Sequence, residues 1–342
     1  MRQRQRSVSW PGRRQPADAT GGRGRWALVV VAVLCCLVLL VAWTLGRRED
    51  ARPIDREAAA LAPSGGALLG AWVKSLEGQS VEARRQAVTR LEGQLGRRLD
   101  IDHHFYQWDR SFPTEAEVWD LDQGRIPLIS WNGARTDLIA AGAFDDLIRE
   151  RAAGLRALGR PLLLRWFWEM DAARDRWQTV SPASYVAAWR HIHDLFAATG
   201  ARNVAWVWCP NALAFSTGDA AAWYPGDAYV DWICADGYNW APGRPNDRWR
   251  TFEEIFADFY RWGAARGKPL MVAEFGVQER GPGEKAEWLR AVGATLKRQF
   301  PRIAAVVYFS SDKEYDWWLD SSPAALAAFR ELAADAYFNR RG

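Results

Sequence analysis

The segment PLLLRWFWE, residues 161–169, is a short run of large apolar side chains that ends in a carboxylate. A run of this length and composition is typical of a strand that is buried on both faces of a parallel sheet. The segment PLMVAE, residues 269–274, has the same form and also ends in a glutamate. The sequence therefore predicts two buried parallel strands, one ending at Glu169 and the other at Glu274.

Six more apolar runs of similar length occur along the chain, and helical patterns separate them. The eight predicted strands are residues 67–73, 99–108, 126–132, 161–169, 203–211, 230–238, 269–276 and 303–310. Helices are predicted over 80–96, 181–200 and 251–267, the last two with Ser or Thr caps at the start and Gly at the end. Eight strands that alternate with helices predict an α/β fold, the (β/α)₈ TIM barrel, over residues 65–342.

A doubly wound open sheet is the alternative arrangement of alternating strands and helices. Sheets of that kind that bind dinucleotides carry a glycine-rich fingerprint after the first strand. Here GAWVKSLEG, residues 70–78, stands in that place and lacks the fingerprint. We therefore expect the closed barrel, whose active sites lie at the C-terminal ends of the strands.

Residues 26–46, WALVVVAVLCCLVLLVAWTLG, contain no charged side chain. A helix of this length spans about 30 Å, the thickness of the hydrocarbon core of a bilayer. Seven arginines lie in residues 1–25, so the positive-inside rule places this tail in the cytoplasm. We therefore predict a basic cytoplasmic tail (1–25), a single-pass transmembrane helix (26–46), a linker (47–64) and an extracytoplasmic barrel in the cell membrane. A cleavable signal peptide is the alternative, although its apolar region is usually about 7–15 residues long.

The net charge of +4 arises in the N-terminal tail. Beyond residue 25 the chain carries 38 basic and 40 acidic side chains, so the predicted barrel is close to neutral. Nucleic-acid binding would need a strongly basic groove, and we expect no nucleic-acid partner. The 21 tryptophans are unusual, and exposed indole rings among them could stack against the apolar faces of sugar rings.

The four cysteines fall into two pairs. Cys35 and Cys36 lie in the predicted transmembrane helix, whereas Cys209 and Cys234 lie on neighbouring predicted strands. We expect Cys209 and Cys234 to be free, buried thiols. A disulfide between them in an oxidising compartment is the alternative.

The four histidines, at positions 103, 104, 191 and 193, lack the usual spacing of metal ligands. We therefore expect neither a metal ion nor an organic cofactor. His103 and His104 are adjacent on a predicted strand, so their side chains point to opposite faces of it. A position of one of the two close to the site is an alternative, and a structural role away from it is the main expectation.

Glu169 and Glu274 end the fourth and seventh predicted strands, which can face each other across a barrel mouth. Cleavage of a glycosidic bond needs two carboxyl groups, one to protonate the leaving oxygen and one to attack carbon or activate water. The acid must stay protonated near neutral pH, and apolar neighbours such as Trp166 and Trp168 would favour this, although packing in the barrel is an equal alternative for them. The pair therefore predicts glycoside hydrolysis.

Four segments occur in an order that resembles a known family. They are WVWCPN (206–211), YPGDAYVDWICADGYNW (224–240), KPLMVAEFG (268–276) and WWLDSSPAALAAFR (317–330). The resemblance is to glycoside hydrolase family 26, retaining barrel enzymes of clan A that include β-mannanases and relatives acting on mixed-linkage glucan or xylan, and it extends from about residue 70 to residue 329. It implies that Glu169 is the acid/base, that Glu274 is the nucleophile and that Tyr238 supports the nucleophile.

The fourth strand departs from the family pattern R-P-x-H-E-M-N. Arg165, Glu169 and Met170 are kept, whereas Trp168 replaces the histidine and Asp171 replaces the asparagine. An indole in place of an imidazole changes how a sugar at the cleavage point is held. The resemblance therefore implies activity but weakens mannan as the substrate.

Nine residues near the strand ends are predicted to bind substrate. They are Trp108, Trp131, Arg165, Trp168, Asp171, Asn211, Tyr238, Trp240 and Trp317. Packing in the core is an equal alternative for Trp108 and Trp131. Arg165 is also expected to lie one layer inside the barrel, where it would organise the carboxylates.

The sequence thus predicts a retaining endo-β-glycanase that acts by double displacement. Its expected substrate is a β-linked polysaccharide, namely mannan, glucomannan, mixed-linkage glucan or an exopolysaccharide made at the same cell surface. The alternatives are a non-catalytic barrel that binds glycan at the cell surface and a transglycosylase in exopolysaccharide assembly. We identified no mark of a protein partner.

Overall fold

The computed structural model describes residues 61–339. The predicted cytoplasmic tail (1–25), the transmembrane helix (26–46) and most of the linker (47–64) lie outside the described residues. Among residues 61–339, no helix is both long and apolar enough to span a membrane. Leu61 and Ala62, at the end of the predicted linker, already pack against the interior of the barrel.

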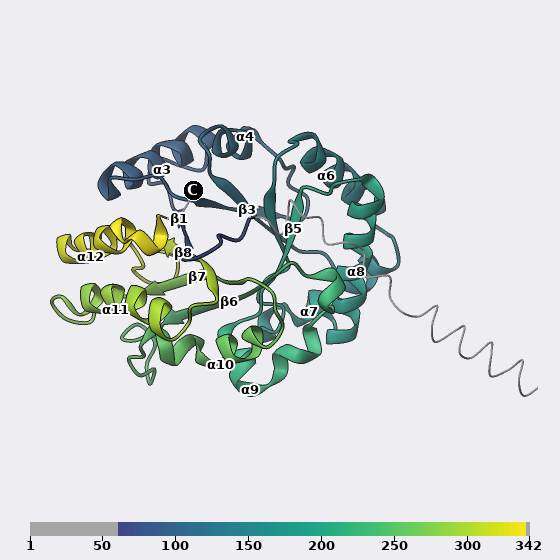
Figure 1. Ribbon diagram of the computed structural model, residues 1–342. Helices are drawn as coiled ribbons and strands as arrows, with labels where there is room; N and C mark the ends of the chain where they lie inside the picture. Colours follow the sequence, from purple (N-terminus) through teal and green to yellow (C-terminus); the bar gives the residue numbers. More distant parts are fainter. Residues whose placement is uncertain (1–60, 340–342) are drawn as a thin grey trace, which may run out of the picture. The chain divides into compact units, whose positions relative to one another are not determined.

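The eight predicted strands form a closed parallel barrel in chain order, as expected (Figure 1). They are β1 (Leu68–Val73), β2 (Ile101–Gln107), β3 (Ile126–Asn132), β4 (Leu162–Trp166), β5 (Val204–Trp208), β6 (Trp232–Asn239), β7 (Leu270–Val277) and β8 (Ile303–Ser310). β1 pairs with β8 from Leu68↔Ala305 to Val73↔Ser310, which closes the barrel. Since every strand has two neighbours, the open sheet is ruled out.

Helices surround the barrel and follow one another around it in chain order (Figure 1). They are α3 (Val81–Leu95), α4 (Glu115–Asp122), α5 (Thr136–Ala140), α6 (Asp145–Ala157), α7 (Arg176–Thr179), α8 (Pro182–Thr199), α9 (Ala212–Thr217), α10 (Phe252–Ala264), α11 (Glu284–Arg298) and α12 (Pro323–Ala334). Short 3₁₀ segments are η1 (Ala173–Asp175), η2 (Asp219–Trp223), η3 (Asp227–Tyr229) and η4 (Ala336–Phe338). The three helices predicted by range are present as α3, α8 and α10.

The caps explain where these helices begin. Ser80, Ser181 and Thr251 each accept a hydrogen bond from a backbone N–H in the first turn of α3, α8 and α10. Such caps satisfy backbone donors that have no partner within the helix. Gly96 and Gly200 end α3 and α8 with positive φ angles, whereas α10 ends at Ala264, before the predicted glycine.

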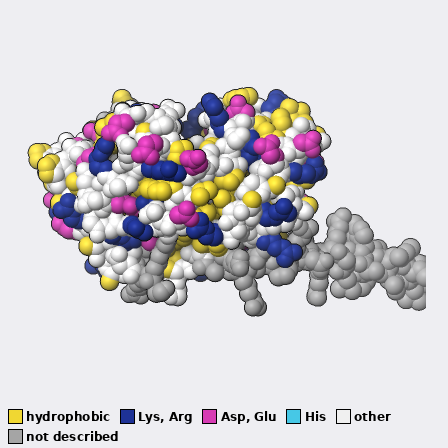
Figure 2. Space-filling model, turned by 90° about the horizontal axis from the view of Figure 1, so that it is seen from above, with side chains coloured by type: hydrophobic (Ala, Val, Ile, Leu, Met, Phe, Trp, Pro, Cys, Tyr) yellow, Lys and Arg dark blue, Asp and Glu magenta, His cyan; other side chains and the backbone are white. Residues whose placement is uncertain are grey.

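Each strand divides its side chains between two cores. One set fills the barrel interior and includes Leu163, Val207, Trp232 and Met271. The other set faces the helices and forms a larger cluster. On the molecular face in Figure 2, hydrophobic side chains gather near the centre, and basic and acidic side chains are intermixed around them.

A disulfide joins Cys209 and Cys234 inside the barrel, so the expectation of two free thiols is wrong. β5 and β6 are paired through Val207↔Trp232 and Trp208↔Ile233, which puts Cys209 opposite Cys234. Their Cα atoms are 4.4 Å apart, within the range that a disulfide spans. The sequence predicts neighbouring strands but does not give their register, and the register decides this bond.

His104 lies on the outer face of β2, where it makes an ion pair that links the strand to α4. Its Nε2 is 2.6 Å from Asp120 and 3.6 Å from Asp102. Burial opposes a charge on this ring, but the nearby carboxylates outweigh burial and raise the pKa of His104 to about 9. The ring is therefore expected to be charged at neutral pH.

We expect His104→Gln to lower the free energy of unfolding by about 2 kcal/mol at pH 6, because a buried, charged hydrogen bond is lost. A pKa that is raised in the folded state stabilises the protein below the unfolded value of 6.5, and this stabilisation is lost as the pH rises through about 9. Thermal unfolding of both proteins from pH 6 to 10 should therefore show the difference in Tm shrinking as the pH rises from about 6.5 to about 9 and staying small above that. A difference that stays constant over this range would contradict the assigned pKa.

Candidate active site

Arg165 lies at the centre of a buried group of polar side chains at the C-terminal ends of the strands. It extends from β4 into the barrel and has no exposed surface. Its guanidinium donates to both carboxylate oxygens of Asp236, at 2.7 and 2.8 Å, and to Glu274 at 2.5 Å. It also donates to the Ser130 hydroxyl at 2.7 Å. The expectation that Arg165 organises carboxylates one layer inside the barrel is confirmed, and its complete burial separates it from solvent.

His103 points into the barrel, whereas its neighbour His104 points outward. The Nε2 atom of His103 is 2.7 Å from the Ser130 hydroxyl and 3.2 Å from Arg165 Nη2. Burial, followed by the charge of Arg165, lowers the pKa of His103 well below its usual value. The ring is therefore neutral and can accept a hydrogen bond from Arg165.

Glu274 is held by two donors. Arg165 binds its Oε1 atom, and the Tyr238 hydroxyl donates to its Oε2 atom at 2.5 Å. Burial, with the charge of Glu274 added, raises the pKa of Tyr238 well above its usual value, so this hydroxyl stays a donor. The guanidinium and the hydroxyl thus fix the position of both Glu274 oxygens. The contact expected between Tyr238 and Glu274 is present.

The backbone of β7 helps to orient Glu274. The pairing of β7 with β8 shifts register between Val272 and Phe275, and the pairing with β6 shifts near Asp236. Such irregularities re-aim side chains at the rims of barrels. Ala273 and Glu274 therefore both lie outside the core that faces the helices, whereas Phe275 is part of that core.

Glu169 lies three residues beyond the end of β4, in a turn with unusual backbone angles. Its φ is 53° and that of Phe167 is 44°, in the left-handed region that ordinary side chains avoid. Its backbone N–H donates to the Cys209 carbonyl at 2.8 Å, which ties the turn to the end of β5. Strained residues that are held in this way are frequent at functional sites.

The Glu169 side chain is only 11% exposed, and its environment favours the protonated form. Burial, followed by the negative charge of Glu274, raises its pKa to about 7. Arg174, whose Nη2 atom donates to Glu169, opposes this rise. Glu169 and Glu274 thus have different environments: the pKa of Glu169 is raised by burial, whereas Glu274 accepts hydrogen bonds from Arg165 and Tyr238.

A group of aromatic side chains packs beside Arg165, which binds Glu274. Trp168 lies 4.9 Å from the Arg165 guanidinium and 5.2 Å from the Phe105 ring. Trp72 stacks on Phe309 at 4.7 Å, and both contact Phe105. The sequence analysis missed Trp72, Phe105 and Phe309. Their alternation with outward-facing residues on β1, β2 and β8 is the signal that could have found them.

A second aromatic group lies beside Tyr238. Trp240 and Trp317 each have ring centroids 5.0 Å from the Tyr238 ring. Trp317 is buried and packs beside Tyr238, so little of its surface is open to a substrate. Trp240 is half-buried, and the Arg244 guanidinium covers its ring at 3.3 Å.

Trp131 has no exposed surface to offer a substrate, whereas Trp108 is partly exposed and its role in binding stays a prediction. Trp131 is fully buried among side chains that face the helices, and Trp108 stacks on it at 4.2 Å. The alternation of side chains along a strand gives the reason. Ser130 on β3 and His103 on β2 point into the barrel, so Trp131 and Trp108, one and five positions further on, point outward. Trp131 is thus part of the core, and Trp108 packs against it with partly exposed surface.

Asp171 and Asn211 form a pair at the rim of the barrel. Asp171 accepts hydrogen bonds from the Asn211 backbone N–H at 2.9 Å and from its side-chain amide at 3.1 Å. The pair connects the loop after β4 with the loop after β5. Both residues keep partly exposed surface, as a sugar-binding role would require.

Two groups of described residues bring three possible metal ligands together, one of Cys209, Cys234 and Asp236 and one of Asp102, His104 and Asp120. In the first group the sulfur atoms are joined in the disulfide. In the second group His104 already pairs with both carboxylates. Neither group offers a ready set of ligands.

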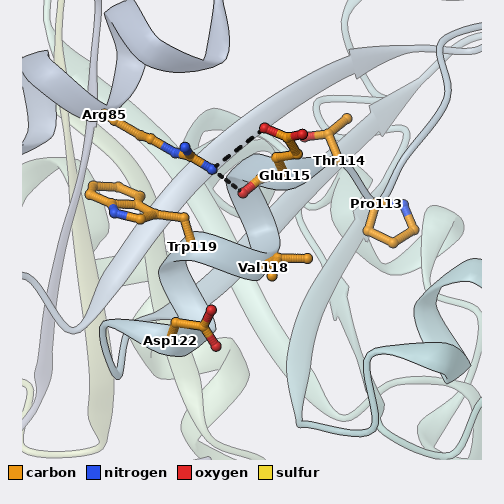
Figure 3. Close-up of a pocket in the computed structure, with 7 residues that line it drawn as sticks. All are labelled: Arg85, Pro113, Thr114, Glu115, Val118, Trp119 and Asp122. Carbon is orange, nitrogen blue, oxygen red and sulfur yellow. Dashed lines mark hydrogen bonds and ion pairs between the residues drawn. The ribbon is translucent and has the colours of Figure 1, made fainter.

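Figure 3 shows a surface pocket at α4 that is separate from the two glutamates. It is lined by Arg85, Pro113, Thr114, Glu115, Val118, Trp119 and Asp122. Arg85 donates to the Glu115 carbonyl at 2.7 Å across its edge (Figure 3). None of these residues is among the side chains that bond to Glu169 or Glu274, which are Arg165, Arg174 and Tyr238.

Comparison with known sequences gives a consistent picture. The model of "Glycosyl hydrolase family 26" matches residues 103–292. "Endoglucanase H" of Acetivibrio thermocellus is 34% identical over 78% of this chain and 30% of that protein. "Mannan endo-1,4-beta-mannosidase A and B" of Caldalkalibacillus mannanilyticus is 26% identical over 58% of this chain and 35% of that protein. The chain spans about a third of the length of these curated relatives.

Solved structures agree in fold. A family 26 β-mannanase from Bacteroides ovatus superposes with a TM-score of 0.59 at 13% identity, covering 84% of this chain and 92% of that one. A ruminal family 26 endo-β-1,4-mannanase gives a TM-score of 0.59 at 17% identity, covering 80% and 64%. At such low identity these structures show the barrel fold alone. Because the family model matches more than half of the sequence and includes both strand-end glutamates, the chain belongs to glycosyl hydrolase family 26.

Proposed function

We propose that this protein is a retaining endo-β-glycanase in which Glu169 is the acid/base and Glu274 the nucleophile. The observation that carries the proposal is the contrast between the two carboxyl groups. Burial raises the pKa of Glu169 to about 7, while Arg165 and Tyr238 both donate hydrogen bonds to Glu274. Pairs of carboxyl groups whose environments differ in this way divide the roles of acid and nucleophile.

The reaction follows from these roles in two steps. Glu274 forms a bond to the anomeric carbon while the glycosidic C–O bond breaks and Glu169 gives its proton to the leaving oxygen. Glu169, now a carboxylate, then removes a proton from water, and the water oxygen displaces Glu274 from the anomeric carbon. Arg165 orients Glu274 throughout, and Tyr238 supports its second oxygen.

The substrate is a β-linked polysaccharide. Relatives carry the names endoglucanase, mannan endo-1,4-β-mannosidase and β-1,3-xylanase, which supports attack within a β-glycan chain. Trp168, beside Arg165 and Phe105, replaces the histidine expected in β-mannanases of the family. We therefore propose mixed-linkage glucan, glucomannan or an exopolysaccharide ahead of mannan.

The catalytic pair is tested with a panel of mannan, glucomannan, mixed-linkage glucan and β-1,3-xylan. We expect the purified protein to release oligosaccharides from one polymer, and we expect Glu169→Gln and Glu274→Gln each to lower the rate at least about 100-fold. Products are measured by mass spectrometry. Glu253→Gln, an exposed glutamate on α10, is the matched control and should keep its rate. Equal rates in all three variants would overturn the assignment, and binding without turnover by the wild type would favour a glycan-binding barrel.

The pH dependence tests the acid separately. Glu169 must be protonated to act, so kcat/KM should fall about tenfold per unit as the pH rises above about 7. An aryl glycoside with a good leaving group needs no acid for its release. In Glu169→Ala, the first step with such a substrate should therefore lose this decline at high pH. A decline that persists in Glu169→Ala would assign it to another group.

We also propose that the barrel lies outside the cytoplasm, tethered by the segment at 26–46. The Cys209–Cys234 disulfide supports an oxidising compartment, since such bonds are rare in the cytosol. The near-neutral barrel and the arginine-rich tail support the same orientation.

A protease added to intact cells should digest the barrel while a cytosolic marker protein stays intact. Fractionation should recover the uncleaved chain in the membrane pellet. Barrel that resists the protease until the cells are lysed would contradict the orientation, and barrel found only in the medium would contradict the tether.

A further inference from the structure

Arg174 is an exposed cation that touches the acid/base carboxyl. It belongs to η1, in the loop that follows Glu169, and its side chain is 66% exposed. Its Nη2 atom donates to Glu169 Oε2, and its Nε atom lies 3.4 Å from Asp175. The guanidinium therefore joins a buried carboxyl group to the solvent-facing side of the barrel mouth.

The rim near Arg174 carries other charged groups. The charge of Glu314, in the loop after β8, acts on Arg174. Glu314 also lies 3.9 Å from Arg244, whose guanidinium covers the Trp240 ring. Two arginines with one shared acidic neighbour thus lie at the mouth, and Arg174 is the one in contact with Glu169.

The position of Arg174 indicates which part of a bound substrate it would contact. Glu169 gives its proton to the leaving oxygen, so a group in contact with Glu169 lies on the leaving-group side of the cleaved bond. A guanidinium presents a planar fork of donors that matches a carboxylate in two parallel hydrogen bonds. A neutral sugar offers hydroxyl groups only, which do not need a charged partner.

We propose that Arg174 binds a ring carboxylate on the sugar at the leaving-group side, so that the substrate is an anionic β-glycan containing uronic acid residues. This inference rests on the proposed role of Glu169 as the acid/base. A substrate carboxylate competes with Glu169 for the guanidinium. When it wins, Glu169 loses the partner that favours its ionised form and takes up the proton that it must donate.

The free enzyme and the complex therefore differ in the state of the acid. Without substrate, Arg174 lowers the pKa of Glu169 against the larger effects of burial and of Glu274. When an acidic substrate is bound, Arg174 pairs with the sugar carboxylate instead of Glu169. Burial then has the larger effect on the pKa of Glu169. Arg174 thus acts as a specificity residue that couples recognition of negative charge to protonation of Glu169.

The test uses one polymer in three forms. Mixed-linkage glucan is compared with the same glucan oxidised at C6, which carries ring carboxylates, and with its carboxymethyl ether, whose carboxylates are appended to the ring. kcat/KM is measured at pH 5.5, where Glu169 is protonated in every variant. The variant is Arg174→Gln, and the control is Arg261→Gln, an exposed arginine on α10 that pairs with Asp258.

We expect the wild type to prefer oxidised over neutral glucan, and Arg174→Gln to lower this preference about tenfold, as expected for loss of a charged hydrogen-bonded pair. Arg261→Gln should keep the preference. Rescue by Arg174→Lys should be partial, since lysine keeps the charge and loses the fork. A preference that is the same in wild type and Arg174→Gln would overturn the proposal. A preference for the carboxymethyl ether over the oxidised glucan would overturn the assignment of ring carboxylates and indicate carboxylates appended to the ring.

Two further measurements separate this inference from the proposed function. With neutral glucan, the decline of kcat/KM at high pH should move to higher pH in Arg174→Gln, and an unmoved profile would show that Arg174 does not act on Glu169. If no polymer is cleaved by the wild type, the proposed hydrolysis fails on its own. Affinity electrophoresis in gels that contain oxidised glucan then tests whether Arg174 binds the substrate carboxylate. Equal retardation of wild type and Arg174→Gln would overturn that role.

Discussion

The structure of the site depends on one buried cation, the guanidinium of Arg165. A charge with no exposed surface is costly unless opposite charges and hydrogen bonds surround it. Asp236 and Glu274 supply the opposite charges, and Ser130 and His103 complete the shell. Because these partners come from β2, β3, β6 and β7, a single side chain of β4 fixes the strand ends of half the barrel relative to one another.

The two glutamates differ because the barrel gives them different surroundings. Glu274 accepts hydrogen bonds from Arg165 and Tyr238, one on each oxygen. Glu169 lies in a strained turn outside that shell, where burial and the charge of Glu274 favour the neutral acid. Arg174 is the one described cation that donates to Glu169, and it comes from the solvent side. The two carboxyl groups thus differ in the cation that each one contacts: Arg165 for Glu274 and Arg174 for Glu169.

Strand and helix positions could be predicted closely, since apolar runs and caps such as Ser80 and Thr251 are local signals. The direction of individual aromatic side chains could not. Trp131 and Trp168 both stand near strand ends in the sequence, yet one faces the helices and the other lies over Arg165. Phe167 and Glu169 have left-handed backbone angles, and this changes the side to which the side chains beyond β4 point. No pattern in the sequence predicts such a turn.

The sequence by itself determined the barrel, the order of its strands and the presence of a glutamate at the ends of β4 and β7, because burial on both faces imposes short apolar runs. It also determined the family, through motifs that are contiguous in the chain. The tertiary structure alone decided the contacts of Arg165, the bond between Cys209 and Cys234 and the meeting of Arg174 with Glu169. These depend on register, bulges and loop paths, which arise from contacts between residues far apart in the chain.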